Sequence, residues 1–181
     1  MKNVLLLMFD NVEELEAIAP IDILRRAGAN VVVASVAEKL FVKGRSNIEI
    51  KCDVLFNDVK EKSFDAVVVS GGAGVNDIVK NADLLKFINR HNQQNAIIGA
   101  ICAAPVVLKQ AGVLQGKQCT AHTSRVYELE NCDITKPVVC DENIITSRGA
   151  GTAIEFALTL AEKIFSAEIT KEVANSICFM R

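Results

Sequence analysis

Short runs of consecutive apolar residues alternate along the chain with stretches in which apolar residues recur every three or four positions. The continuous runs are rich in valine, isoleucine and leucine, which is typical of strands buried on both faces of a sheet. The spaced pattern is typical of amphipathic helices. The predicted strands cover residues 3–8, 30–36, 64–70 and 96–101.

The predicted helices follow these strands, and glycines mark where two of them end. They lie at about 12–27, 83–92, 104–112, 151–165 and 167–179. Residues 41–56 alternate and contain turn residues, which indicates a small hairpin or an excursion at the sheet edge, and residues 136–147 predict a second hairpin around "DEN". Strands alternating with helices favour an α/β fold with a mostly parallel sheet covered by helices on both faces.

Composition narrows the possible partners. The chain has 181 residues, a length typical of one domain, with 50% hydrophobic and 23% charged residues and a net charge of −2. No cluster of Lys and Arg is longer than a pair, so we expect no general binding to nucleic acid or membrane surfaces. The first apolar run is too short for a signal-peptide core, and no run reaches the ~18 residues of a membrane span, so we expect a cytoplasmic protein.

Six cysteines and two histidines are spread along the chain. No cysteine pair has C-x-x-C spacing, and His91 and His122 are far apart in sequence, so we expect no zinc or other metal site. A disulfide framework is also not expected without a secretion signal. The cysteines are Cys52, Cys102, Cys119, Cys132, Cys140 and Cys178.

Three stretches with chemical potential fall at the ends of predicted strands. They are "FDNVEELE" after the first strand, "SGGAG" after the third and "ICAAP" after the fourth. In open parallel sheets, ligands bind outside the carboxyl ends of the strands. We therefore expect these stretches to meet at one edge of the sheet.

Cys102 is predicted to lie where the fourth strand turns into a helix. Unpaired amides and the helix dipole at such a place favour an anion, which predicts a thiol pKa below the usual value of about 8.5. Pro105 is compatible with a first helical turn, and small residues surround the cysteine. Spacing alone leaves a reactive thiol and a buried structural one equally open.

The other two stretches are similarly ambiguous when taken alone. "SGGAG" can hold an oxyanion or form a plain tight turn. Glu16 precedes Pro20 by four residues, which predicts a helix distortion beside an acid, whereas the other first-turn carboxylates are expected to face water. His122, after the apolar segment "KQCTA", is a candidate acid or base, and His91 is expected to be solvated.

Taken together, these motifs resemble the ThiJ/PfpI superfamily and, within it, the branch of the parkinsonism-associated protein deglycase. The resemblance covers nearly the whole chain, 1–181, as a single domain of the class I glutamine amidotransferase-like type. The motifs are "EELE", "PIDILRRAG", "DAVVVSGG", "AICAAP", "TAHTS" and "TSRGAGTAIEFAL".

The resemblance implies a flavodoxin-like three-layer sandwich and a homodimer. It makes Cys102 the functional cysteine and Glu16 its partner acid, with the carboxyl protonated and hydrogen-bonded to the sulfur. It implies an oxyanion pocket formed by the amides of Gly72, Ala73 and Ala103. His122 matches a histidine near the sulfur, and Arg26 and Arg148 match arginines near a dimer-lined site.

Three positions depart from the family pattern. Ala103 follows the cysteine where the protease branch has a histidine, which argues against peptidase activity. Ala150 stands where relatives often have proline, which predicts a less rigid loop. Cys52 lies near, but not at, the position of an additional cysteine in some relatives.

For function, the resemblance implies a cofactor-free, cysteine-dependent glyoxalase or deglycase. Its substrates would be methylglyoxal-type dicarbonyls or their early adducts on proteins and nucleotides, in the stress response. The alternative is a redox-sensing, cytoprotective chaperone whose cysteine oxidises to a sulfinate. A thiamine-pathway or amidase role ranks below both.

Overall fold

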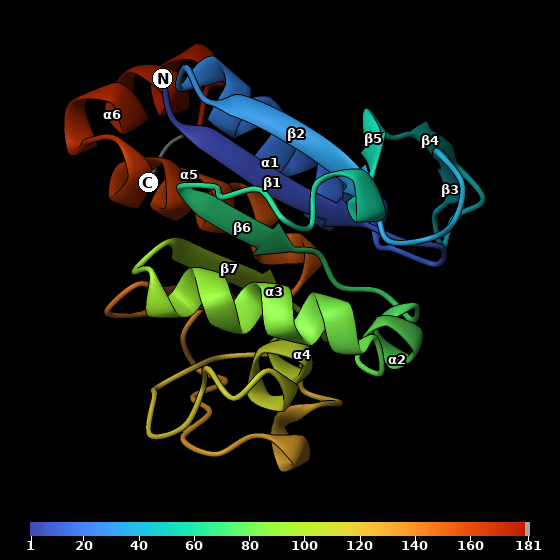
Figure 1. Cartoon of the computed structure of the whole chain (residues 1–181). Coiled ribbons are helices and arrows are strands. Elements are labelled where there is room, and N and C mark those ends of the chain that lie inside the picture. Colours follow the sequence, from blue (N-terminus) through green and yellow to red (C-terminus); the bar gives the residue numbers. More distant parts are fainter. Residues whose placement is uncertain (180–181) are drawn as a thin grey trace.

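Seven strands form one twisted sheet in the order β5-β2-β1-β6-β7-β9-β8 (Figure 1). All neighbours pair in parallel except β8 and β9, which form the predicted hairpin. The computed structural model describes residues 1–179. The strands are β1 (Asn3–Met8), β2 (Asn30–Ser35), β5 (Val54–Leu55), β6 (Ala66–Val69), β7 (Ile97–Ile101), β8 (Val138–Asp141) and β9 (Ile144–Ser147).

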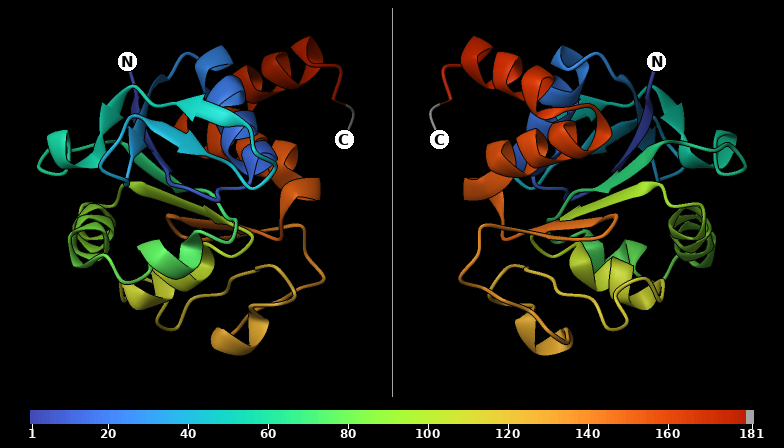
Figure 2. Two further views of the ribbon diagram at one scale, coloured as in Figure 1. Left: turned by 90° about the vertical axis from the view of Figure 1, so that its right-hand side faces the viewer. Right: turned by 90° about the vertical axis from the view of Figure 1, so that its left-hand side faces the viewer.

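Helices cover both faces of the sheet (Figure 2). One layer contains α1 (Glu14–Arg26), α5 (Ala153–Ile164) and α6 (Ala167–Ser176), and the opposite layer contains α2 (Val75–Ile78), α3 (Ala82–Gln93) and α4 (Pro105–Gln110). Because both faces are covered, the central strands are apolar throughout, and Val4–Met8 have no exposed surface. The predicted α/β sandwich with a mostly parallel sheet is confirmed.

The region 41–56 makes a separate hairpin before returning to the sheet. β3 (Phe41–Lys43) and β4 (Glu49–Lys51) pair in antiparallel fashion, and β5 then joins the sheet edge ahead of the 3-10 turn η1 (Phe56–Asp58). Both features expected there, the hairpin and the edge excursion, are present.

The long connection between α4 and β8 is less regular than the sequence indicates. The segment "KQCTA" forms no strand and makes only an isolated bridge between Cys119 and Cys132. The 3-10 turn η2 (Val126–Glu128) follows it, and a further turn, η3 (Ala150–Thr152), leads into α5. None of the helices within residues 1–179 has the length and apolar character needed to cross a membrane.

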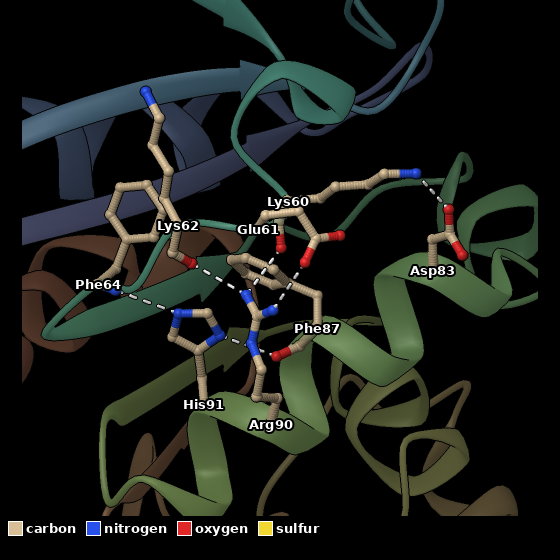
Figure 3. Close-up of polar contacts among 8 residues, drawn as sticks. All are labelled: Lys60, Glu61, Lys62, Phe64, Asp83, Phe87, Arg90 and His91. Atoms are coloured by element: carbon tan, nitrogen blue, oxygen red, sulfur yellow. Dashed lines mark hydrogen bonds and ion pairs between the residues drawn. The ribbon is translucent and has the colours of Figure 1, made fainter.

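His91 is a core residue, and the expectation that it is solvated is wrong. The residue has 0% exposed surface. Figure 3 shows its ring between Phe64 and Phe87, with dashed lines to both. Its Nε2 accepts a hydrogen bond from the Phe64 amide at 3.1 Å, and its Nδ1 lies 2.9 Å from the Phe87 carbonyl. Because Nε2 must accept, the proton is on Nδ1 and the ring is neutral. Burial lowers the pKa of His91, and the ring ties α3 to the start of β6.

We predict that His91→Ala destabilises the fold in a pH-dependent way. The unpaired Phe64 amide costs about 1–3 kcal/mol, and the lost packing adds to this. Because the folded pKa of His91 lies below the unfolded one, its stabilising effect is present above about pH 6.5 and is lost as the pH falls. Urea unfolding at pH 7.5 and 5.5 should show a larger acid-induced loss of stability in wild type than in the variant, and equal losses would contradict the assignment.

Candidate active site

Three segments meet at the carboxyl ends of β1, β6 and β7, which are neighbours in the sheet. The first turn of α1 contributes Glu16, the loop after β6 contributes Gly71 and Gly72, and the turn after β7 contributes Cys102. The three strand-end stretches singled out in the sequence therefore lie together, as expected from the parallel topology.

The backbone at Cys102 is held in an unusual conformation. Its φ of 66° lies in the left-handed region, which costs a non-glycine residue about 1–3 kcal/mol. Two hydrogen bonds hold it there: the Cys102 amide donates to the Ser147 carbonyl at 2.8 Å, and the His122 amide donates to the Cys102 carbonyl at 2.9 Å. The sulfur is therefore aimed by a sharp turn that precedes α4, which begins at Pro105.

Glu16 reaches the sulfur through a gap that a glycine leaves open. The Glu16 side chain is 1% exposed, and its carboxyl accepts hydrogen bonds from the Gly71 amide at 3.0 Å, from the Ala150 amide and from the Cys102 thiol. A Cβ on Gly71 would lie 2.6 Å from the Cys102 Cβ and would overlap Glu16 Oε2. The contact between acid and thiol therefore depends on the missing side chain at position 71.

Pro20 has a different effect from the predicted distortion, since α1 runs through it without a break. Proline has no amide proton, so the Glu16 carbonyl four residues earlier lacks its usual helical donor. The hydroxyl of Ser70, at the end of β6, donates to that carbonyl at 3.4 Å instead. The proline thus frees a carbonyl that ties Glu16 to the neighbouring strand.

Two backbone amides point at the sulfur, those of Gly72 and Ala103. Gly72 has φ +110°, and a Cβ there would lie 2.6 Å from the Glu13 amide nitrogen. Ala73 is exposed, and its carbonyl accepts from the Asn76 amide in the first turn of α2. Of the three amides expected in an oxyanion pocket, the structure brings those of Gly72 and Ala103 to the sulfur and leaves Ala73 at the surface.

Burial dominates the electrostatics of the pair. Burial raises the pKa of Glu16 to about 7, in the direction expected for an acid beside a thiol. Burial, followed by the charge of Glu16 and the hydrogen bond to it, raises the pKa of Cys102 to about 12. The expectation of a lowered thiol pKa is wrong, because the two amides do not outweigh burial and a neighbouring carboxylate. Burial thus opposes ionisation of both groups, and the hydrogen bond between them couples their protonation.

His122 comes from the irregular connection and presents one edge of its ring to the site. The Ser124 amide and hydroxyl lie 3.2 Å and 2.8 Å from Nδ1. Because the amide can only donate, Nδ1 accepts and the neutral ring carries its proton on Nε2. A Cβ on Gly149 would lie 3.7 Å from His122 Cδ2, 3.8 Å from Glu16 Oε1 and 3.9 Å from Cys102 Sγ, so these three side chains converge on Gly149.

The structure does not bring the two candidate arginines to the sulfur within one chain. Arg26 pairs with Asp22 at 2.9 Å on the exposed end of α1, about 15 Å along the helix axis from Glu16. The backbone of Arg148 lies next to Gly149, but its side chain turns away and donates to the Ile134 carbonyl at 3.1 Å. Their role near a dimer-lined site stays a prediction.

Sequence reasoning missed the groups that hold the acid and the histidine in place. These are the Gly71 and Ala150 amides at the Glu16 carboxyl, the Ser70 hydroxyl, and Ser124 at His122. Only the glycine pair gave a signal, because it marks a close backbone approach. Within residues 1–179, no group of three or more Asp, Glu, His or Cys side chains is placed to hold a metal ion.

Comparison with solved structures shows that other proteins share the fold of this chain. The solved structure of Drosophila melanogaster DJ-1beta has a TM-score of 0.96 at 36% identity, and the match covers 99% of both chains. The structure of oxidised Toxoplasma gondii DJ-1 has a TM-score of 0.96 at 33% identity, and the match covers 100% of both chains. These likenesses confirm the flavodoxin-like sandwich.

Curated relatives agree with the structural likeness. The chain is 42% identical over 159 residues to Arabidopsis thaliana protein DJ-1 homolog A, and the match covers 86% of this chain but only 41% of that protein. The match to the related homolog B covers 39% of that protein. The chain is 31% identical over 180 residues to the Caenorhabditis elegans glutathione-independent glyoxalase DJR-1.2, and this match covers 98% of this chain and 96% of that protein.

The family profile extends over most of the chain and includes every residue of the site described above. It matches residues 2–163, from the start of the first strand to the end of α5. By sequence, fold and the arrangement of its strand-end residues, this chain belongs to the DJ-1/PfpI family.

Proposed function

We propose that the chain is a cofactor-free glyoxalase and deglycase that acts on methylglyoxal-type dicarbonyls or their early amine adducts. The observation that carries this proposal is the buried Glu16 carboxyl in hydrogen-bond contact with the Cys102 thiol. Such a pair supplies a nucleophile and its base together. The substrate class is supported by the relative named as a glutathione-independent glyoxalase.

The first step uses the proton shared by the pair. As the Cys102 sulfur adds to the aldehyde carbon, its proton passes to the Glu16 carboxylate, which is available as a base because its pKa is about 7. The carbonyl oxygen becomes an oxyanion. The amides of Gly72 and Ala103, which point at the sulfur, are placed to stabilise it.

The second step moves hydrogen between two carbons of the adduct. Loss of the proton from the carbon bound to sulfur and its return to the adjacent carbon give a thioester of a 2-hydroxy acid. Before this transfer, Glu16 returns the thiol proton to the oxyanion, which gives a hemithioacetal and restores the carboxylate. Glu16 then carries the carbon-bound proton, while His122 donates from Nε2 to the second oxygen and takes up the proton of the first. Water then cleaves the thioester, restoring the thiol, so methylglyoxal and water together give lactate. An amine adduct gives the same acid and the free amine.

Peptide hydrolysis is not part of the proposal, because Ala103 replaces the histidine of the protease branch. The family does support other chemistry, since a 30% identical relative from Pseudomonas putida is named isonitrile hydratase. The glyoxalase relative has the higher coverage, 96% of its own length against 74%.

A second candidate function is redox sensing at the same sulfur. The observation that favours it is the similar structure of Toxoplasma gondii DJ-1, which is described as oxidised. The Gly72 and Ala103 amides and a protonated Glu16 offer hydrogen-bond donors to the oxygens of a sulfinate. Catalysis and oxidation would then compete for one cysteine.

We also propose that the chain forms a homodimer through α1. Leu15 and Ile18 are exposed on this helix, and Ile154 is exposed on α5, which packs against it. Beside them, the buried Glu14 uses Oε1 to accept the Ser46 amide at 2.8 Å, while its Oε2 has no hydrogen-bond partner within the described residues. A second copy would cover the apolar side chains and offer a donor to that oxygen.

Replacing Glu16 by Gln should accelerate alkylation of Cys102 and slow catalysis. The charge and hydrogen bond that raise the thiol pKa are removed, so alkylation by iodoacetamide at pH 7.5 should rise about tenfold for each unit of pKa lost. Lactate formation should fall by roughly 10²–10⁴-fold because the base is absent. Exposed Glu61→Gln is the control. Slower alkylation in Glu16→Gln would show instead that Glu16 donates a proton to a thiolate.

Replacing Cys102 by Ser should abolish lactate formation from methylglyoxal, because a hydroxyl is a far weaker nucleophile than a thiol in this pair. Cys140→Ser, at an exposed cysteine outside the site, should retain wild-type activity. An enzymatic lactate assay measures both variants. Full activity in Cys102→Ser would remove the enzyme proposal.

Mild peroxide should add two oxygens to Cys102 before it modifies any other cysteine. Cys52 and Cys119 have only 1% and 0% exposed surface, whereas Cys102 is partly exposed, so the reagent reaches neither of them as readily. Peptide mass spectrometry over a peroxide series locates the added oxygens. First oxidation at exposed Cys140 or Cys178 would contradict the sensor proposal.

Replacing Ile18 by Glu should yield monomers, because a charge would be buried in the apolar contact between two copies. Light scattering during gel filtration gives the mass of each species. Ile134 is also an exposed isoleucine but lies in the connection between α4 and β8. Ile134→Glu is therefore the matched control and should leave the mass at that of a dimer. A wild-type monomer at micromolar concentration would contradict the proposed dimer.

A further inference from the structure

Cys119 and Cys132 lie opposite one another in the irregular connection between α4 and β8. They form an isolated parallel bridge, in which the Cys119 amide donates to the Asn131 carbonyl at 3.1 Å and the Asp133 amide donates to the Cys119 carbonyl at 2.8 Å. Both thiols are free. This is the one bridge between two cysteines within residues 1–179, and neither residue takes part in the site around Cys102.

The bridge gives the pair the backbone separation that a disulfide needs. Paired strands lie about 4.7–4.9 Å apart, and disulfides span Cα distances of about 4.4–6.8 Å. Directly paired residues project their side chains to the same face. Each thiol is close enough to shift the pKa of the other, so the two sulfurs are neighbours and side-chain rotation can bring sulfur to sulfur.

The two cysteines differ in their access to solvent. Cys119 has no exposed surface, and its thiol also lies 3.6 Å from the Glu130 carbonyl, whereas Cys132 is partly exposed. An external reagent therefore meets Cys132 first. Cys119 is the buried neighbour that can attack a sulfur already bonded to Cys132.

We propose that Cys119 and Cys132 form a second redox site, a dithiol that small-molecule disulfides oxidise to an intrachain disulfide. Cys132 attacks one sulfur of the reagent, which forms a mixed disulfide and releases one small thiol that takes up the proton of Cys132. Cys119 then attacks the Cys132 sulfur, which forms the protein disulfide and releases the second small thiol with the proton of Cys119. One disulfide is reduced to two thiols as the dithiol is oxidised.

The new bond would close the segment that carries His122. Residues 120–131 lie between the two cysteines, and the His122 amide in this segment donates to the Cys102 carbonyl. A covalent link across the base of this segment restricts how far it can open. Oxidation of the dithiol therefore stabilises the loop beside the active-site cysteine without consuming the Cys102 thiol, and the inference does not depend on the proposed glyoxalase activity.

The test is to incubate the folded protein with oxidised glutathione, alkylate the remaining thiols and digest with trypsin. Cleavage after Lys117 and Arg125 places Cys119 in the peptide 118–125 and Cys132 in the peptide that begins at residue 126. Because Pro137 follows Lys136, this second peptide also contains Cys140. We expect the two peptides to be linked in wild type and in Cys140→Ser, and the link to be absent in Cys132→Ser and after reduction.

A second readout follows the loop itself. Amide hydrogen exchange over residues 120–131 should be slower in the oxidised protein than in the reduced one, and this difference should be absent in Cys132→Ser. Circular dichroism before digestion shows that each variant is folded. Free thiols at both positions, glutathione retained on Cys132, or a link that survives Cys132→Ser would each overturn the proposed dithiol. Unchanged exchange in the oxidised protein would overturn its effect on the loop.

Discussion

The contact between the Glu16 carboxyl and the Cys102 thiol is the interaction on which the rest of the site depends. It exists because position 71 has no side chain, since a Cβ there would collide with both groups. The left-handed turn at Cys102 aims the sulfur, and the Gly71 and Ala150 amides hold the acid. Each of these supports comes from a different segment, and the parallel sheet brings the segments together.

Burial determines how this pair behaves chemically. It raises the pKa of Glu16 to about 7 and that of Cys102 to about 12, so burial opposes the loss of a proton from either group. The hydrogen bond between them lets a proton pass from one group to the other, which is what the proposed attack by the sulfur requires.

The connection between α4 and β8 contributes both to the site around Cys102 and to the cysteine pair outside it. It holds His122 against Cys102 through a backbone hydrogen bond and orients the ring through Ser124. The same connection contains the paired Cys119 and Cys132, whose thiols contact each other. Its irregular backbone allows both arrangements, because neither a helix nor a continuous strand would return residue 132 to residue 119.

Much of the fold was predictable because strand and helix patterns are local properties of the chain. Strands buried on both faces must be continuously apolar, so β1, β2, β6 and β7 could be located. Ligands bind at the carboxyl ends of parallel strands, and Glu16 and Cys102 each follow such an end, so both became candidate site residues. Family motifs then singled out the same two residues.

What only the tertiary structure decided depends on groups that are distant in sequence. His91 is polar and has polar neighbours in the sequence, yet α3 places its ring in contact with Phe64, where it is buried. The pKa of Cys102 is raised, not lowered as the sequence predicts, because burial and the Glu16 charge, contributed by separate segments, outweigh two local amides. Similarly, Cys119 and Cys132 meet only because the connection folds back on itself. Sequence thus determined the elements and the candidate site residues, whereas burial and proximity, which sum over the whole chain, determined the direction of their pKa shifts and their partners.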